Sequence, residues 1–176
     1  LCEVPMAVVY RTSLPTYRRN DLWQLSLAGT PSWSEITPPT GPTARSGQRA
    51  IYDPVRNRMI IFGGNDGAYL NDVWALSLAG PPEWTQLQPA GPAPPPRDGH
   101  SWVYDSVRDR AVLFGGVRGT TYYSDSWEFA LGSNLWRPLP LFNAPAPRSG
   151  QAMVYDPDAD RLALFSGFAY FGHVTD

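Results

Sequence analysis

The chain has no lysine, one cysteine and two histidines, and each scarcity removes a class of protein. A single cysteine, Cys2, cannot build an internal disulfide framework. His100 and His173 lie in different parts of the chain and do not supply the ligand set of a zinc site. All 14 basic residues are arginine, yet the net charge is −2. The chain as a whole therefore has no electrostatic basis for binding nucleic acid or an anionic membrane.

Long apolar runs and helical patterns are also missing. No apolar stretch approaches the roughly 18 residues that a membrane span needs, and no segment keeps a helical period. The sequence has no phosphate-binding loop, no nucleophile elbow and no paired carboxylates outside its repeats. It therefore predicts a protein that is not an enzyme and that carries no cofactor or metal.

What the sequence does contain is a block of about 50 residues, present twice in full and in part at each end. An arginine opens each block, a Tyr-Asp pair follows, an apolar run then ends in two glycines, and two spaced tryptophans come last. The opening arginines are Arg45, Arg97 and Arg148; the aspartates are Asp53, Asp105 and Asp156; the glycine pairs are Gly63–Gly64 and Gly115–Gly116, with Ser166–Gly167 as a variant; the tryptophan pairs are Trp23 and Trp33, Trp74 and Trp84, Trp127 and Trp136.

Each block predicts four short strands. In the first full block these cover residues 48–53, 59–62, 73–78 and 84–87. The second strand is an unbroken apolar run, which is typical of a strand buried on both faces. The two glycines after it predict positive φ or close approach to a neighbouring backbone.

Four antiparallel strands in about 50 residues is the layout of a β-propeller blade. The double glycine, the Tyr-Asp pair and the spaced tryptophans resemble the kelch family. The resemblance implies an all-β fold of about three four-stranded kelch-type blades, incomplete or completed by association. The expected units are a partial blade with its linker at 1–44, full blades at 45–96 and 97–147, and a partial blade at 148–176. The arginine bias and the Ala-Gly-Pro-rich linkers are similar to bacterial kelch proteins, many of which are extracytoplasmic.

The ends of the chain fall within blades. Residues 6–10 match the second strand of a blade, and Asp176 matches the position of Asp72. An open run of blades leaves an apolar sheet face at each end, and such faces are interaction sites. We expect the isolated chain to self-associate, with a two-fold homodimer completing a ring.

Most recurring polar residues have a structural interpretation. Recurrence at one repeat position favours a hydrogen-bonding role for Arg97 and its equivalents. Asp53 is followed five residues later by Arg58, which predicts an ion pair or cap across the tight turn. The tryptophans are expected to pack between adjacent blades. His100 occupies the position of Gln48 in the preceding block, which argues against a catalytic or metal-binding histidine.

The blocks differ most between their second and third strands, at residues 11–20, 65–71, 117–124 and 168–175. Function in a repeat fold concentrates where repeats differ, and blade topology places these connections on one face. They are rich in tyrosine and arginine, which anchor interfaces, and aromatic rings also stack on sugars. The candidate binding residues are Tyr17, Arg18, Arg19, Tyr69, Arg118, Tyr122, Tyr123, Phe168, Tyr170 and His173.

Three functions remain open at this point. The first is a non-catalytic scaffold that binds a protein or glycan partner through this face. The second is a piece of a larger propeller enzyme, a copper oxidase or hydrolase, whose catalytic residues lie outside the chain. The third is a structural half-propeller that exists to assemble.

Overall fold

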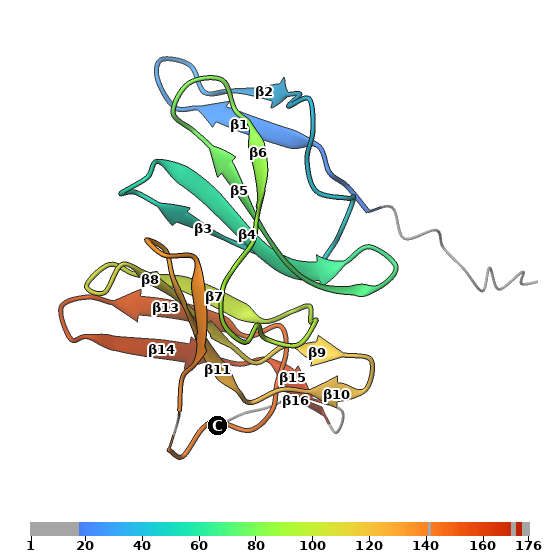
Figure 1. The fold of residues 1–176 in the computed structure, drawn as a ribbon, viewed down its shortest axis with the longest axis vertical. Helices are drawn as coiled ribbons and strands as arrows, with labels where there is room; N and C mark the ends of the chain where they lie inside the picture. Colours follow the sequence, from blue (N-terminus) through green and yellow to red (C-terminus); the bar gives the residue numbers. More distant parts are fainter. Residues whose placement is uncertain (1–17, 141, 170–171, 174–176) are drawn as a thin grey trace, which may run out of the picture.

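The computed structural model describes residues 18–140, 142–169 and 172–173, the last two by their backbone only. Within these ranges every regular element is a β-strand (Figure 1). The all-β prediction is confirmed. No helix in the described ranges is long and apolar enough to span a membrane. The expected strand at residues 6–10 lies outside the described residues.

The strands form four sheets, numbered here along the chain, and two short ribbons. Sheet 1 pairs β1 (Leu22–Ser26) with β2 (Ser32–Ile36), and sheet 4 pairs β13 (Ala152–Asp156) with β14 (Arg161–Phe165). Sheet 2 has the order β3 (Arg49–Asp53), β4 (Arg58–Asn65), β5 (Tyr69–Ser77), β6 (Trp84–Leu87). Sheet 3 has the order β7 (Ser101–Asp105), β8 (Arg110–Phe114), β11 (Ser126–Ala130), β12 (Leu135–Pro138). The ribbons are β9 (Val117–Arg118) with β10 (Thr121–Tyr122), and β15 (Phe168–Ala169) with β16 (Gly172–His173).

All strand pairs in these sheets and ribbons are antiparallel. Sheets 2 and 3 are the two expected four-stranded units, and their strands meander in chain order from the first to the fourth. The exact division of the chain into four repeat units stays a prediction.

The first strands of successive sheets converge on one side. β7 lies against both β3 and β13. Sheets 1, 2 and 3 follow one another down the long axis of the molecule, and sheet 4 overlaps sheet 3 in this view (Figure 1). Short backbone hydrogen bonds link the entries to these strands: Gly99 N–H donates to Gly47 O at 3.0 Å, and Gly150 N–H to Gly99 O at 2.7 Å. This is the arrangement of propeller blades around an axis, and the described sheets leave the ring open.

The glycine pairs allow the chain to pass close to the neighbouring blade. A Cβ on Gly63 would lie 2.8 Å from the Arg97 carbonyl oxygen of the next repeat, and Gly63 has φ of 63°. Gly115 is held in the same way against Arg148 O, at 2.7 Å. The prediction of positive φ and close approach is confirmed. Ser166 takes the same conformation, with φ of 59°, so the variant repeat keeps the backbone path.

The core lies between sheets 2 and 3. Phe62 of β4 has no exposed surface; its ring lies 5.0 Å from that of Trp136 and 5.9 Å from that of Trp102, centroid to centroid. Phe129 packs on Trp136 at 4.8 Å. The apolar runs of β4 and β8 are buried as predicted, so hydrophobic burial between neighbouring sheets holds the two blades together.

The tryptophan prediction is correct for only part of the set. Trp136 is fully buried, but Trp23 and Trp33 of sheet 1 are 48% and 65% exposed. Trp74 and Trp127 are half-buried. The same repeat position is buried only where a neighbouring sheet covers it, because one sheet cannot bury both of its own faces.

The outer sheets show the same effect. β14 was expected to be buried on both faces, yet Phe165 is 79% exposed, and Leu162 and Val154 of sheet 4 are also exposed. Phe165 and Val154 lie on one face of sheet 4 and Leu162 on the other, so among the described residues neither face is fully covered. Self-association of the isolated chain through its end sheets stays a prediction.

His100 is enclosed by the core. It is fully buried, and its ring lies 5.2 Å from that of Phe62. Neither ring nitrogen has a hydrogen-bond partner among the described residues. Burial, with the nearby charges of Arg97 and Arg49, lowers the pKa of His100 to about 3. The imidazole is therefore neutral and is enclosed as an apolar ring would be.

We expect Trp136→Ala to lower the free energy of unfolding by about 3–5 kcal/mol, because it opens a cavity between sheets 2 and 3. Trp33→Ala, at the same repeat position in sheet 1, is the matched control and should change it by less than about 0.5 kcal/mol. Urea denaturation followed by circular dichroism measures both. Equal losses in the two variants would show that the core does not lie where we place it.

His100 also predicts a pH dependence of stability. The unfolded chain binds the proton with a pKa near the ordinary value of 6.5, whereas the folded chain resists it until about pH 3. Stability is thus complete above pH 6.5 and falls as the pH drops through that window. Between pH 7 and pH 5 the loss should be about 2 kcal/mol. His100→Gln introduces the glutamine found at this position in the other repeats and should remove this pH dependence of the unfolding free energy. If the variant lost as much stability between pH 7 and pH 5 as the parent, His100 would not be the cause.

Candidate functional site

The tight turns between first and second strands carry the recurring Asp–Arg pairs. Asp53 accepts hydrogen bonds from Arg56 N–H at 3.2 Å and from Arg58 Nε at 2.8 Å. Burial raises the pKa of Asp53, but the hydrogen bonds from Arg58 and Arg56 outweigh it and hold that pKa below its usual value. Asp105 and Arg110 repeat the pair at 2.8 Å. The predicted turn caps are confirmed.

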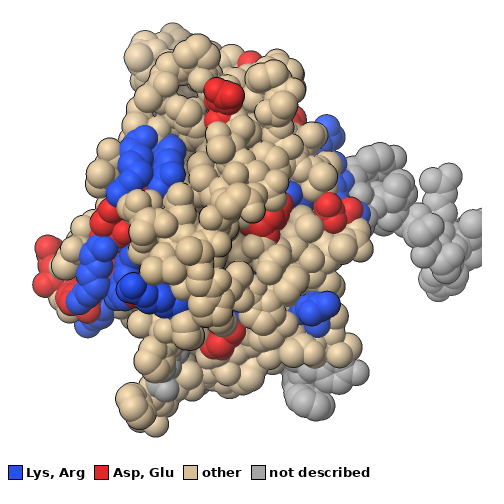
Figure 2. All heavy atoms as spheres, viewed as in Figure 1, with Lys and Arg blue, Asp and Glu red and all other residues tan. Residues whose placement is uncertain are grey.

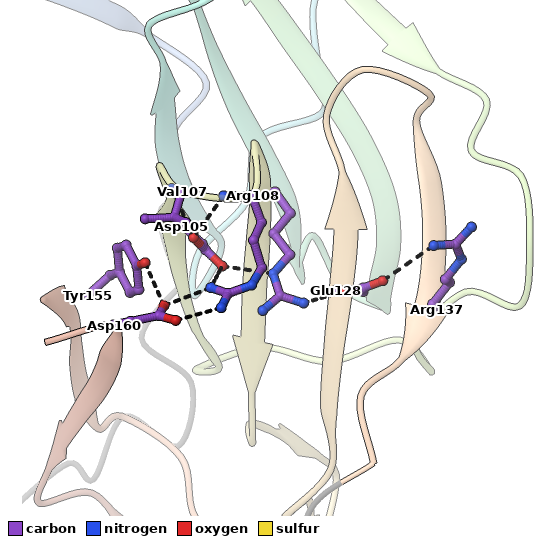
Figure 3. Close-up of polar contacts among 8 residues, drawn as sticks. Asp105, Val107, Arg108, Glu128, Arg137, Tyr155 and Asp160 are labelled. Atoms are coloured by element: carbon purple, nitrogen blue, oxygen red, sulfur yellow. Dashed lines mark hydrogen bonds and ion pairs between the residues drawn. The ribbon is translucent and has the colours of Figure 1, made fainter. Parts of the chain in front are cut away.

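These turns also link one sheet to the next. Arg56 binds Asp109 of the following sheet at 2.6 Å, and Arg108 binds Asp160 at 2.5 Å. Figure 3 shows Arg108 reaching from its own turn across to Asp160, where Tyr155 also donates its hydroxyl. We call this side, formed by the β3–β4, β7–β8 and β13–β14 turns, the turn face.

The turn face gathers charges of both signs, on the left in Figure 2. Arg110 adds a contact to Glu128, and Glu128 also lies 3.7 Å from Arg137. Arginines and carboxylates there satisfy one another. The turn face therefore uses its arginines as structural links within and between blades.

The arginine that opens each repeat is buried beneath the side of the molecule opposite the turn face. Arg97 is fully buried and binds both oxygens of Asp125, at 2.6 and 2.8 Å. It also donates to Gly115 O at 2.9 Å, and Trp127 Nε1 donates to the same Asp125 at 2.7 Å. Arg45, Asp72, Gly63 and Trp74 repeat the set. The predicted hydrogen-bonding role is confirmed for Arg45 and Arg97, whose guanidinium groups are occupied by protein partners.

The connections between second and third strands form the face opposite the turn face. They are β-ribbons rather than plain loops: β4 and β5 extend to Asn65 and Tyr69, and β9–β10 and β15–β16 are short ribbons. The tips of the β4–β5 and β9–β10 ribbons lie on the right in Figure 1. Each ribbon is fixed by a bridge to the start of its own repeat, as in the pair of Asp98 with Val117. We call this side the ribbon face.

Two positions on the ribbon face meet across neighbouring sheets. Arg18 Nη2 donates to Asn65 Oδ1 at 2.9 Å. Two repeats later, the rings of Tyr122 and Phe168 meet edge to face at 5.9 Å. Tyr69 aligns with Tyr122 in the repeat. The same contact position is thus polar at one end of the face and aromatic at the other.

The exposure of these side chains separates binding candidates from structural ones. Phe168 is 50% exposed, Arg19 and Arg118 are exposed, and Tyr69 and Tyr122 are half-buried. Tyr123 lies under the Arg97 guanidinium, 4.0 Å from ring centroid to Cζ, so it supports the buried arginine. Tyr17 and Tyr170 lie outside the described residues, and so does the side chain of His173.

Two features escaped the sequence reasoning. Asn65 contacts Arg18, and alignment of Asn65 with Phe168 in the repeat would have marked it. Trp102 is buried in the core, but it has no tryptophan at the same position in the other repeats, so the repeat gave no signal for it.

The described residues hold no group of three or more histidine, cysteine, aspartate or glutamate side chains placed to bind a metal. His100 is enclosed in the core and is unavailable to a ligand. In the described parts of the chain, the ribbon face is where the aromatic pair Tyr122 and Phe168 and the exposed Arg19 and Arg118 lie.

Comparison with known proteins finds similarity across the repeated blocks. A family model described as the KLHDC2/KLHL20/DRC7 Kelch-repeats domain matches residues 11–176. The chain is 32% identical over 130 residues to the Leucine-zipper-like transcriptional regulator 1 homolog of Drosophila melanogaster, covering 68% of the chain and 12% of that protein. It is 32% identical to Dynein regulatory complex subunit 7 of Chlamydomonas reinhardtii, over 67% of the chain and 10% of that protein. Human Host cell factor 1 is 30% identical over 74% of the chain and 7% of its own length. The chain thus spans about a tenth of these relatives.

We expect Arg97→Met to lower the free energy of unfolding by about 3 kcal/mol, because it leaves Asp125 and the Gly115 carbonyl without their buried partner. Arg118→Met removes an exposed arginine and should change stability by less than about 0.5 kcal/mol. Thermal and urea unfolding measure both. A wild-type stability for Arg97→Met would reopen an anion-binding role for the repeat arginines.

Proposed function

The chain belongs to the Kelch-repeat family, and from that premise we propose that it is a non-catalytic interaction scaffold that binds a protein through its ribbon face. The observation that carries the proposal is the contact between Tyr122 and Phe168, with Phe168 half exposed. Large aromatic side chains on a rigid support are the usual anchors of protein interfaces.

The framework beneath the face supports this function. The ribbons are bound by backbone bridges to the start of each repeat, such as Ser149 with Phe168. They also rest on the buried Arg97 network through Tyr123. A surface held in this way loses little conformational freedom on binding, which favours affinity.

The names of the relatives agree with a scaffold. One is called a subunit of a dynein regulatory complex and another a transcriptional regulator homolog. Those names belong to much longer proteins, so the partner of this chain is not inferred from them. A protein is favoured over a glycan because the ribbon face exposes Arg19 and Arg118 as well as aromatic rings, and arginine and tyrosine are enriched in protein–protein hot spots.

A photo-crosslinking amino acid placed at Tyr122 should capture a protein from extracts of the source cell, whereas the same group at Val107 should not. Val107 is 61% exposed and lies on the turn face, so it controls for general stickiness. With the captured protein purified, Phe168→Ala should weaken binding about tenfold, or about 1.4 kcal/mol. Val107→Ala should change the affinity less than twofold, within about 0.4 kcal/mol.

Equal capture at the two positions would contradict the proposal, since it would show that the ribbon face is not preferred. An unchanged affinity for Phe168→Ala would contradict the role of the aromatic pair. Matching melting curves for the variants would exclude misfolding as the cause of any loss.

A further inference from the structure

Two strands of the described fold have a partner on one edge only. β1 pairs with β2 and β14 pairs with β13, whereas the second and third strands of sheets 2 and 3 pair with each other, as β8 does with β11. β14 is the second strand of its repeat, and β1 is the third strand of its own. Within one copy their open edges do not meet, because sheet 2 lies between them (Figure 1). Open strand edges are sites at which another chain can pair.

The two open edges match the paired strands of sheet 3. β14 and β1 have five residues each, as do β8 and β11. In sheet 3, Leu113 lies opposite Trp127, and the same repeat positions hold Leu164 in β14 and Trp23 in β1. The Trp23 indole donates to the carboxylate two residues before it at 3.0 Å, as the Trp127 indole does at 2.7 Å. β1 therefore presents its side chains as the third strand of sheet 3 does.

A cavity beside β1 fits the side chain that β14 would bring. It has a volume of about 220 Å³, lies against sheet 2, and takes its apolar lining from Leu22, Ala50, Met59, Ile61 and Trp84. At the junction of sheets 2 and 3, Phe62 fills the equivalent space against Trp102 and Trp136. Phe165 has the repeat position of Phe62 and is exposed. Ala50 stands where sheet 3 has Trp102, which leaves room for an incoming ring.

The turns of sheets 4 and 2 also match each other. Ion pairs such as Arg56 with Asp109 link each turn to the next one. If sheet 4 preceded sheet 2 of another copy, Ala159 would stand at the arginine position and Asn57 at the aspartate position. Neither position then brings a charge without its partner. The gap in the series of ion pairs thus falls on the two sides that would meet.

We infer that β14 of one copy pairs with β1 of a second copy, so that two half-blades form one four-stranded blade. The register taken from sheet 3 sets Phe165 opposite Leu22, Ala163 opposite Gln24 and Arg161 opposite Ser26. The contact joins two different surfaces, and its repetition about a two-fold axis closes a ring. Each copy supplies two full blades and half of two more. The ring then has six blades, which lies within the usual range for propellers.

Residues 6–10 of the same chain are the competing partner for β1, because their sequence matches a second strand. A second strand is followed by two glycines, and the second of these has φ of 96° at Gly64, 101° at Gly116 and 105° at Gly167. Thr12 stands at that position after residues 6–10, and a β-branched residue is strongly disfavoured at such φ. β14, which keeps Gly167, is therefore the better second strand.

Light scattering on the full chain should give twice the mass of one copy at high concentration and the single mass on dilution. Phe165→Asp places a charge in the cavity and should give the single mass at every concentration, with an unchanged circular dichroism spectrum. Val107→Asp, at an exposed apolar residue of the turn face, is the matched control and should leave the dimer intact. The dimer buries residues that one copy exposes, Trp33 included, so stability should rise with concentration, and dilute protein reports the single copy.

A disulfide experiment tests the register. Directly opposite residues have Cβ atoms about 4.5–5.5 Å apart, within a small shift of disulfide geometry. On a Cys2→Ser background, a mixture of Ala163→Cys and Gln24→Cys chains should form a disulfide-linked dimer under mild oxidation, whereas neither chain alone should. A mixture of Ala163→Cys with Ser34→Cys is the control and should stay unlinked, because Ser34 lies one strand further away, opposite Gln24.

Three results would overturn the inference. A single mass for the parent at every concentration would exclude the dimer, and a dimer that survives Phe165→Asp would exclude the pairing of β14 with β1. Equal linking at Gln24 and Ser34 would exclude the register. A loss of stability in Val8→Asp, in a parent that keeps the single mass, would show that residues 6–10 occupy the edge instead.

Discussion

The buried guanidinium at the start of each repeat is the interaction on which the blades depend. Arg97 ties together three parts of its own blade: the Gly115 carbonyl after the second strand, Asp125 before the third, and through Asp125 the indole of Trp127. A fully buried charge is tolerable only when such partners surround it. The arrangement fixes where the second strand ends and the third begins, and so it fixes the base from which each ribbon rises.

Contacts between blades divide the surface into two chemically different faces. On the turn face, Arg56 and Arg108 each form an ion pair with an aspartate of the next turn, and these ion pairs link neighbouring blades. The ribbon face keeps its arginines and the rings of Tyr122 and Phe168 for solvent or a partner. The two faces therefore differ in whether their arginines are paired, which a count of charges over the chain cannot reveal.

Local patterns predicted the fold well because each depends on residues close in sequence. The apolar run at β4, the Asp53–Arg58 turn and the double glycine all appear where the repeat placed them. Burial was less predictable: Trp33 and Trp136 share a position but differ in exposure, because neighbouring sheets decide it. For the site, the sequence identified the variable connections but could not separate Tyr122 from Tyr123, since the contact of Tyr123 with the buried Arg97 joins residues far apart in the sequence.

In each Arg–Asp contact between turns, the arginine comes from the earlier repeat and the aspartate from the next one. This order limits which repeat can be duplicated without losing a contact. The repeat with Arg108 and Asp109 carries both halves of the contact, giving one and receiving the other. The preceding turn has Arg56 but Asn57, and the following turn has Asp160 but Ala159. In an evolving gene, tandem duplication of the middle repeat would keep every contact matched at each new junction. Duplicating either neighbour would place an asparagine or an alanine there, so the middle repeat is the natural unit of lengthening.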